Sequence, residues 1–188
     1  MSKASTTAGR GARARAEQAA ASQHEQSPLF GRVAQWVTLL ARLGLAGVLG
    51  YAGFIKVLDP LTSARAVRAY QLLPESLVTP VGYGLPFLEI VLALLLLLGV
   101  ATRYAGIVGG LIMVAFIVAI ASVWARGISI ECGCFGGGGQ IAPGQTEYGL
   151  DILRDVGLVL VGAWIAVFPP GRFALDRWLI GEPTETVR

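Results

Sequence analysis

One stretch of this sequence constrains the fold more than any other: the residues from Tyr104 to Ala125 carry no charged side chain. A helix needs about 20 predominantly apolar residues to cross the hydrocarbon core of a bilayer. The stretch meets that length, and its apolar residues go all round instead of forming the single apolar face of a helix on a soluble protein. It therefore predicts a membrane-spanning helix.

The composition of the whole chain agrees with this interpretation. Of its 188 residues, 54% are hydrophobic and only 14% are charged, whereas soluble domains have about 25% charged residues. The length favours a single domain, so we expect an integral membrane protein in contact with the lipid bilayer. The sequence pI of 9.1 does not predict binding to nucleic acid, because the basic residues do not alternate with aromatic ones.

Three further apolar segments flank this stretch. They run from about Ala34 to Leu58, from about Leu77 to Val100, and from about Gly149 to the residue before Pro169. Strands are not expected inside lipid, because an open sheet cannot satisfy its edges there. The predicted fold class is therefore an all-α membrane protein, with a bundle of four transmembrane helices over residues 29–170.

The two ends of the chain are polar. Residues 1–28 are rich in Ala, Ser, Gln, Thr and Arg, which is typical of a disordered tail, and they contain the only histidine, His24. The basic residues of this tail are not followed by the apolar core and cleavage site of a secretory signal. Residues 171–188 form a second short tail.

Basic residues predict the orientation, because cytoplasmic segments carry an excess of Lys and Arg. This places both termini in the cytoplasm and the protein in the cytoplasmic (plasma) membrane. The links at 59–76 and 126–148 then lie outside, and the first has helical character that would suit the membrane surface. The residues that carry the argument are Arg10, Arg13, Arg15, Arg32, Arg103, Arg172 and Arg177.

The second outward link holds both cysteines, Cys132 and Cys134, with only Gly133 between them. Disulfides persist outside the cytoplasm, and residues at this spacing can reach the Cα separation that a disulfide needs. The small ring would be strained and therefore labile, and it would close too little chain to act as a staple. These properties favour a redox role, with the glycines at 136–139 acting as slack that lets the pair reach a partner.

Two other interpretations of the cysteines stay open. They could be incidental thiols in a Gly-rich loop, or they could bind a soft metal such as Cu(I) or Zn. Zinc normally takes four ligands, and the chain offers no further cysteine. Only Glu131 lies close by in the sequence, and His24 is predicted on the opposite side of the membrane, so no metal site is assigned.

Two charges lie deep in the predicted helices. Counted from the inner helix ends at 1.5 Å per residue, Arg42 lies roughly 12 Å deep and Glu89 roughly 16 Å deep. Isolated charges at such depths are costly and usually pair, so we predict an Arg42–Glu89 contact. It would be either an inert ion pair that fixes the helix register or a site for protons or a quinone headgroup.

A second group of charges is expected at the outer end, at the level of the cysteines. Lys56 ends the first segment, and Arg154 and Asp155 lie in the first turns of the fourth. Cationic neighbours favour the reactive thiolate, so these residues would support Cys132 and Cys134. Alternatively, Lys56 extends towards lipid headgroups, and Arg154 pairs with Asp151 or Asp155.

Several motifs together resemble one family. They are "CGCFG", the preceding "RGISIECGC", "LRD", "YAGFIKVLDP" and "LPFLEIVLALLLLLGVATR". The chain resembles the MauE branch of the DoxX-like membrane proteins over roughly residues 35–168. The resemblance implies a four-helix, redox-associated protein with Cys132 and Cys134 as its functional residues. The namesake supports maturation of the disulfide-rich subunit of methylamine dehydrogenase, and wider relatives are linked to thiosulfate–quinone oxidoreduction or thiol stress defence.

The leading hypothesis is a thiol–disulfide redox protein that supports disulfide formation or maturation of extracytoplasmic proteins. Its electron partner would be a thioredoxin-like or secreted redox protein, or a membrane quinone, which is the one candidate cofactor. The alternative is a non-enzymatic assembly factor or scaffold that binds a soft metal transiently. A transporter is disfavoured because no inverted pair of broken helices is visible.

Overall fold

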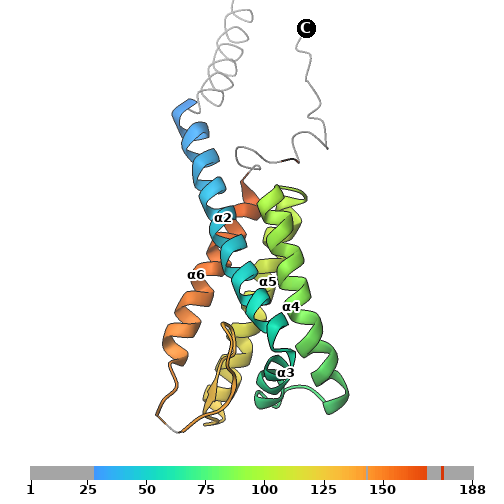
Figure 1. Ribbon diagram of the computed structural model, residues 1–188. Coiled ribbons are helices and arrows are strands. Elements are labelled where there is room, and N and C mark those ends of the chain that lie inside the picture. Colours follow the sequence, from blue (N-terminus) through green and yellow to red (C-terminus); the bar gives the residue numbers. More distant parts are fainter. Residues whose placement is uncertain (1–27, 143, 169–174, 176–188) are drawn as a thin grey trace, which may run out of the picture.

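The computed structural model describes residues 28–142, 144–168 and 175 (Figure 1). The tails predicted at 1–28 and 171–188 lie outside the described residues, apart from Pro28 and Leu175. His24 and the basic residues of both tails are therefore outside as well. The disorder predicted for residues 1–28 stays a prediction.

The described residues form a helical bundle in which successive long helices run in opposite directions (Figure 1). The short helix α3 and the segment between α5 and α6 lie at one end. The link between α4 and α5 lies at the other end of the bundle, and α2 extends beyond it there. The helices are α2 (Pro28–Leu58), α3 (Pro60–Ala69), α4 (Glu75–Leu98), α5 (Thr102–Ala125) and α6 (Tyr148–Val167).

Among the described helices, three are long and apolar enough to cross a membrane. They are Val33–Leu58 within α2, Glu75–Leu98 and Thr102–Ala125. These spans confirm the first three predicted segments, and the chain is a multi-pass membrane protein. Helix α6 is not among them; its first turns carry Asp151, Arg154 and Asp155.

Helix α3 confirms the helical character predicted for the link at 59–76. It begins with Pro60 at its first position, and the Asp59 carboxylate accepts a hydrogen bond from the Thr62 amide at 3.1 Å, which caps the helix. Ser63 donates to the Gly82 carbonyl at 2.7 Å. That carbonyl lacks its usual helical donor because Pro86, four residues on, has no N–H. The proline in α4 thus creates the acceptor that fixes α3 against it.

Two apolar clusters hold the bundle together. The larger joins α2, α4, α5 and α6 around Leu45, Leu49 and Leu96. Helices α5 and α6 approach closely because glycines meet: a Cβ on Gly162 would stand 2.8 Å from the Gly106 carbonyl oxygen. The smaller cluster ties α3, α5 and the start of α6 to the cysteine-bearing segment, through Ala69, Tyr70, Ile120, Val123, Ile130 and Tyr148.

The link between α5 and α6 departs from the all-α prediction. It contains two short antiparallel strands, β1 (Ile130–Glu131) and β2 (Gly139–Gln140), with Ile130 opposite Gln140 and Glu131 opposite Gly139. The argument against strands concerned sheet edges in lipid, whereas this ribbon lies beyond the end of α5. The fold is therefore a helical bundle with one β-hairpin.

Candidate functional site

Both cysteines lie on the hairpin loop between β1 and β2, and both are free thiols. Gly133, between them, has a φ of +70°, a conformation that side chains with a Cβ rarely adopt. A Cβ at this position would also stand 2.7 Å from the Ala66 side chain of α3. Glycine is therefore required here for the loop to pack against α3.

The glycines after Phe135 are not the slack that the sequence suggested. Gly136, Gly137 and Gly138 all have positive φ values, of +83°, +70° and +111°. A Cβ on Gly138 would stand 2.5 Å from the Ala66 side chain, and one on Gly137 would stand 2.7 Å from the Glu131 carboxylate. Glu131 also accepts a hydrogen bond from the Gly138 amide at 3.2 Å. These glycines allow close packing, so the expectation of a free linker was wrong.

Two tyrosines fix the backbone of this segment. The Tyr70 hydroxyl, at the end of α3, donates to the Cys132 carbonyl at 2.8 Å. Burial raises the pKa of Tyr70, so the hydroxyl keeps its proton for this bond. The Tyr148 hydroxyl accepts from the Ile130 amide at 2.8 Å and donates to the Ile128 carbonyl at 2.7 Å. Sequence reasoning missed both tyrosines, because no local pattern marks a side chain that binds a distant backbone.

The two thiols differ in exposure and in acidity. Cys132 is half-buried and Cys134 is buried. A hydrogen bond from the Cys134 thiol lowers the pKa of Cys132 to about 7, although burial acts against this. The same hydrogen bond, together with burial, raises the pKa of Cys134. Cys132 therefore suits the attacking thiolate, and Cys134 suits a protonated second thiol.

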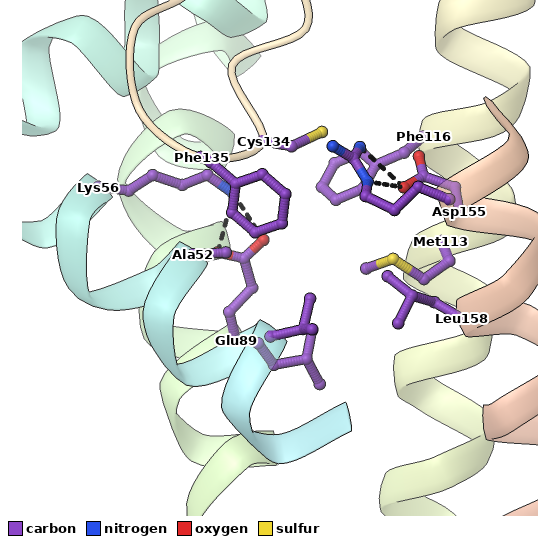
Figure 2. Close-up of a pocket in the computed structure, with 12 residues that line it drawn as sticks. Ala52, Lys56, Glu89, Met113, Phe116, Cys134, Phe135, Asp155 and Leu158 are labelled. Atoms are coloured by element: carbon purple, nitrogen blue, oxygen red, sulfur yellow. Dashed lines mark hydrogen bonds and ion pairs between the residues drawn. The ribbon is translucent and has the colours of Figure 1, made fainter. Parts of the chain in front are cut away.

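Lys56 and Glu89 form a buried ion pair between α2 and α4 (Figure 2). The Lys56 ammonium donates to both carboxylate oxygens of Glu89, at 2.7 and 3.0 Å. It also lies 5.5 Å from the centroid of the Phe116 ring. Because the two side chains are only 6% and 1% exposed, Lys56 does not extend towards lipid headgroups.

The predicted Arg42–Glu89 pair is wrong, since Lys56 occupies Glu89. A Cβ on Gly53 would stand 3.1 Å from the Glu89 Cβ, so Gly53 and Glu89 lie at the same level. Arg42 lies eleven residues earlier on α2, or about 16 Å along the helix axis. The depth estimate failed because α2 extends beyond the end of α4, so their ends are not level (Figure 1). Arg42 is buried towards the end of the bundle away from the cysteines.

Arg154 pairs with both aspartates on α6. Its Nε and Nη2 donate to the Asp155 Oδ1 at 3.0 and 2.9 Å, and its Nη1 donates to the Asp151 Oδ1 at 3.2 Å. Its guanidinium also lies 4.8 Å from the centroid of the Phe135 ring. Asp155 is 1% exposed, and its Oδ2 makes no hydrogen bond to the described residues.

A small cavity brings the predicted polar residues together. It is lined by Lys56, Glu89, Cys134, Arg154 and Asp155, along with Phe135 of the hairpin and apolar side chains of α2, α5 and α6. In the view of Figure 2, Cys134 lies between the Lys56–Glu89 pair and Asp155. The centre of a water molecule can occupy about 10 Å³ of it, which is close to the minimum for one water.

Two further cavities share lining residues with the small one. The first, of about 280 Å³, is bordered by Cys132, Glu131, Gln145, Glu147 and Asp151, and we call it the hairpin cleft. The second, of about 240 Å³, has mostly apolar walls and is called the lateral cavity. Its walls are Lys56, Val57, Pro60, Tyr83, Pro86 and Phe87. Lys56 borders both this cavity and the small one.

No group of three or more His, Cys, Asp or Glu side chains within the described ranges could hold a metal ion. Glu131, the one further ligand that the sequence offered, is instead bound to the Gly138 amide. The two thiols therefore have no assembled ligand set around them in this part of the chain.

Comparisons with known proteins give a consistent result. The family model described as methylamine utilisation protein MauE matches residues 34–168. The methylamine utilization protein MauE of Methylorubrum extorquens is 37% identical over 144 residues, which cover 74% of this chain and 75% of that protein. No solved structure matches the chain. The family match covers α2 from residue 34 onward, helices α3 to α6 and the cysteine hairpin. The chain therefore belongs to the MauE family.

Proposed function

We propose that this protein is a membrane thiol–disulfide redox protein that supports disulfide formation or maturation of extracytoplasmic proteins. One observation carries the proposal: two free thiols share a hydrogen bond, and Cys132 borders an open cleft whereas Cys134 borders a buried polar cluster. Thiol–disulfide exchange requires an accessible thiolate and a second thiol within reach. This arrangement meets both requirements.

In this proposal α6 is a fourth membrane span. Its polar first turns do not argue against it, because Asp155 is buried and Arg154 is bound to two carboxylates. Charges that are paired inside a bundle are tolerated in membrane helices. Arg103 is exposed at the end opposite the cysteines, which supports a cytoplasmic α4–α5 link, cytoplasmic termini and an extracytoplasmic hairpin.

The hairpin cleft is the proposed contact for a polypeptide partner. Its volume of about 280 Å³ would admit a cysteine and its neighbours from a thioredoxin-like or secreted redox protein, but not a folded domain. Its wall carries Glu131, Glu147 and Asp151 together with Arg154. The wall also includes Ile130, Phe135 and Ile141, so it suits a partner segment with both polar and apolar side chains.

A membrane quinone is the second candidate for the electron partner. The lateral cavity favours it, because this mostly apolar space of about 240 Å³ is bordered by the buried residue Lys56. A quinone headgroup is an apolar ring with carbonyl oxygens that accept hydrogen bonds. Oxidation of the dithiol would pass two electrons and two protons to the quinone, giving a disulfide and a hydroquinone.

The biological setting is proposed from the relative's name. The protein of Methylorubrum extorquens is named for methylamine utilization, and the substrate proposed here is a secreted protein of methylamine use that needs disulfides. Cys132 and Cys134 would perform the exchange, and Lys56, Glu89, Arg154 and Asp155 would support them. Arg42 is assigned a structural role.

Thiol trapping in intact cells tests the function and its electron partner. The protein is alkylated in cells with and without respiratory quinone, and the oxidation states of Cys132 and Cys134 are read by mass spectrometry. We expect the pair to shift between dithiol and disulfide when the electron partner is removed. Two thiols that stay reduced under every condition would refute the redox function.

The scaffold alternative predicts a different result. A variant with Cys132→Ser and Cys134→Ser would still bind its secreted partner and support that partner's maturation. If the redox function is correct, this variant loses maturation of the partner's disulfides even though the protein reaches the membrane in normal amounts. Pull-down and partner disulfide mapping in the same cells separate the two.

A further inference from the structure

One buried polar atom near the thiols has no partner within the part of the chain that the structure describes. The Oδ1 of Asp155 accepts two hydrogen bonds from Arg154, but its Oδ2 accepts none. Asp155 is only 1% exposed. A buried carboxylate oxygen without a donor is costly, so a bound water or a proton is expected to satisfy it.

The small cavity supplies the space for that water. Asp155 and Cys134 both line it, and the room for the centre of a water is about 10 Å³. Ordered waters in such cavities make two to four hydrogen bonds, and Lys56 and Glu89 line the same space. A single water could therefore contact the Cys134 thiol and the Asp155 carboxylate at once.

Glu89 is the other carboxylate at the cavity, but it is occupied. Both of its oxygens accept hydrogen bonds from the Lys56 ammonium. A proton could bind Glu89 only by disrupting that pair. Asp155 can take a proton on its Oδ2 while its Oδ1 stays bound to Arg154.

We propose that Asp155 exchanges the proton of Cys134 through one water in the small cavity during thiol–disulfide exchange. The inference rests on the proposed function, because it assigns a role within that reaction. Cys134 needs such help, since it must become a thiolate to react although it is buried and holds its proton in the bond to Cys132.

The exchange runs in two balanced steps. The Cys132 thiolate attacks a disulfide of the partner protein; a mixed disulfide forms, and one partner sulfur leaves as a thiolate. Cys134 then passes its proton through the water to the Asp155 Oδ2, and its sulfur attacks the Cys132 sulfur. The bond from Cys132 to the partner breaks, and the second partner sulfur leaves and takes a proton from solvent. Two electrons pass to the partner, and the reverse reaction returns the proton to Cys134.

A disulfide probe separates the two steps in the full-length protein in lipid nanodiscs. With one equivalent of dipyridyl disulfide, attack by Cys132 releases one thiopyridone, and attack by Cys134 releases the second. We expect Asp155→Asn to leave the first release within about twofold of the unmodified protein and to slow the second at least about tenfold. General acid–base catalysis typically contributes about a hundredfold or more, so tenfold is a conservative threshold. A second release within about twofold of the unmodified protein would overturn the proposal.

Two controls exclude a merely structural effect. Glu75→Gln removes an exposed carboxylate that pairs with Arg68, and both releases should match those of the unmodified protein. The second measurement needs no variant: in the unmodified protein the second release should slow in heavy water more than the first does. If heavy water slows the second release no more than the first, no proton transfer limits it and the proposal fails.

The same traces distinguish this failure from that of the proposed function. An unmodified protein that gives the first release but never the second would show that the cysteines do not act as a pair, which refutes the redox function. Two releases that are insensitive to Asp155→Asn would refute only the role of Asp155.

Discussion

Two ion pairs border the small cavity, and they differ in how many oxygens of the carboxylate accept a hydrogen bond. Between α2 and α4, Lys56 binds both oxygens of Glu89. On α6, Arg154 binds one oxygen of Asp155, leaves the other without a donor among the described residues, and reaches out to Asp151. Asp151 and Arg154 also border the hairpin cleft. In the first pair, which is buried, both carboxylate oxygens are occupied. The second pair borders both the small cavity that holds Cys134 and the hairpin cleft.

This difference separates stability from chemistry. A saturated, buried pair fixes how two helices align, and breaking it leaves an uncompensated charge. A pair with a bare oxygen can accept a proton without losing its partner. The α2–α4 side of the cavity should therefore govern how stable the bundle is, and the α6–hairpin side should govern how the thiols react.

The largest expected effect is on the Lys56–Glu89 pair. Glu89→Gln leaves the Lys56 ammonium buried without its counter-charge, and we expect a loss of about 3–5 kcal/mol in the free energy of unfolding. The matched change Glu75→Gln breaks an exposed pair with Arg68 and should cost far less, because solvent screens exposed ion pairs. Unfolding in mixed micelles measures both variants. Equal losses would show that the Lys56–Glu89 pair does not fix the bundle.

The second effect concerns the thiol side. Because the hydrogen bond from Cys134 lowers the pKa of Cys132 to about 7 from 9.0, alkylation of Cys132 should reach half its maximal rate near pH 7. Cys134→Ala removes the donor, so the thiolate is less favoured and the midpoint should move upward towards 9.0. The rate of reaction with iodoacetamide across the pH range gives both midpoints. An unshifted midpoint would mean that Cys134 does not tune Cys132.

A smaller effect tests whether packing holds the thiols in place. Gly138→Ala would put a Cβ 2.5 Å from the Ala66 side chain at a φ of +111°, and we expect a cost of about 1–3 kcal/mol. Gly144→Ala is the control for strain alone, since Gly144 also has a positive φ but no atom within 4 Å of the added Cβ. Hydrogen exchange of the hairpin amides measures the loosening.

A compensating change sharpens this test. Ala66→Gly removes the side chain that the new Cβ would meet, so the double variant should recover the part of the loss that exceeds that of Gly144→Ala. If Gly138→Ala loosens the hairpin no more than Gly144→Ala does, the contact with α3 does not position the cysteines.

The sequence predicted the features that depend on length and on helix ends. The uncharged stretch from Tyr104 to Ala125 corresponds to α5 (Thr102–Ala125), because bilayer thickness fixes how long such a stretch must be. The proximity of Lys56, Arg154 and Asp155 to the cysteines followed from their shared level at one end of the bundle. These arguments need only the direction of each helix.

Features that depend on register or on distant contacts could not be predicted. The partner of Glu89 depends on the axial position of α2 relative to α4. Arg42 was predicted as the partner because the ends of the two helices were assumed to be level. The glycines at 136–138 were interpreted as a linker because their positive φ angles and the contact with Ala66 arise only in the folded hairpin. Tyr70 binds a carbonyl 62 positions away, and no local pattern encodes that bond.

In the proposed reaction, Cys132 attacks the partner's disulfide and Cys134 resolves the mixed disulfide that forms. Single-cysteine variants test it most directly, because each is treated with dipyridyl disulfide at neutral pH and its mixed disulfide is followed by mass spectrometry. The account predicts that Cys134→Ser forms a stable mixed disulfide on Cys132, and that Cys132→Ser reacts at least about tenfold more slowly through its buried Cys134. Equal rates, or faster reaction at Cys134, would contradict the account.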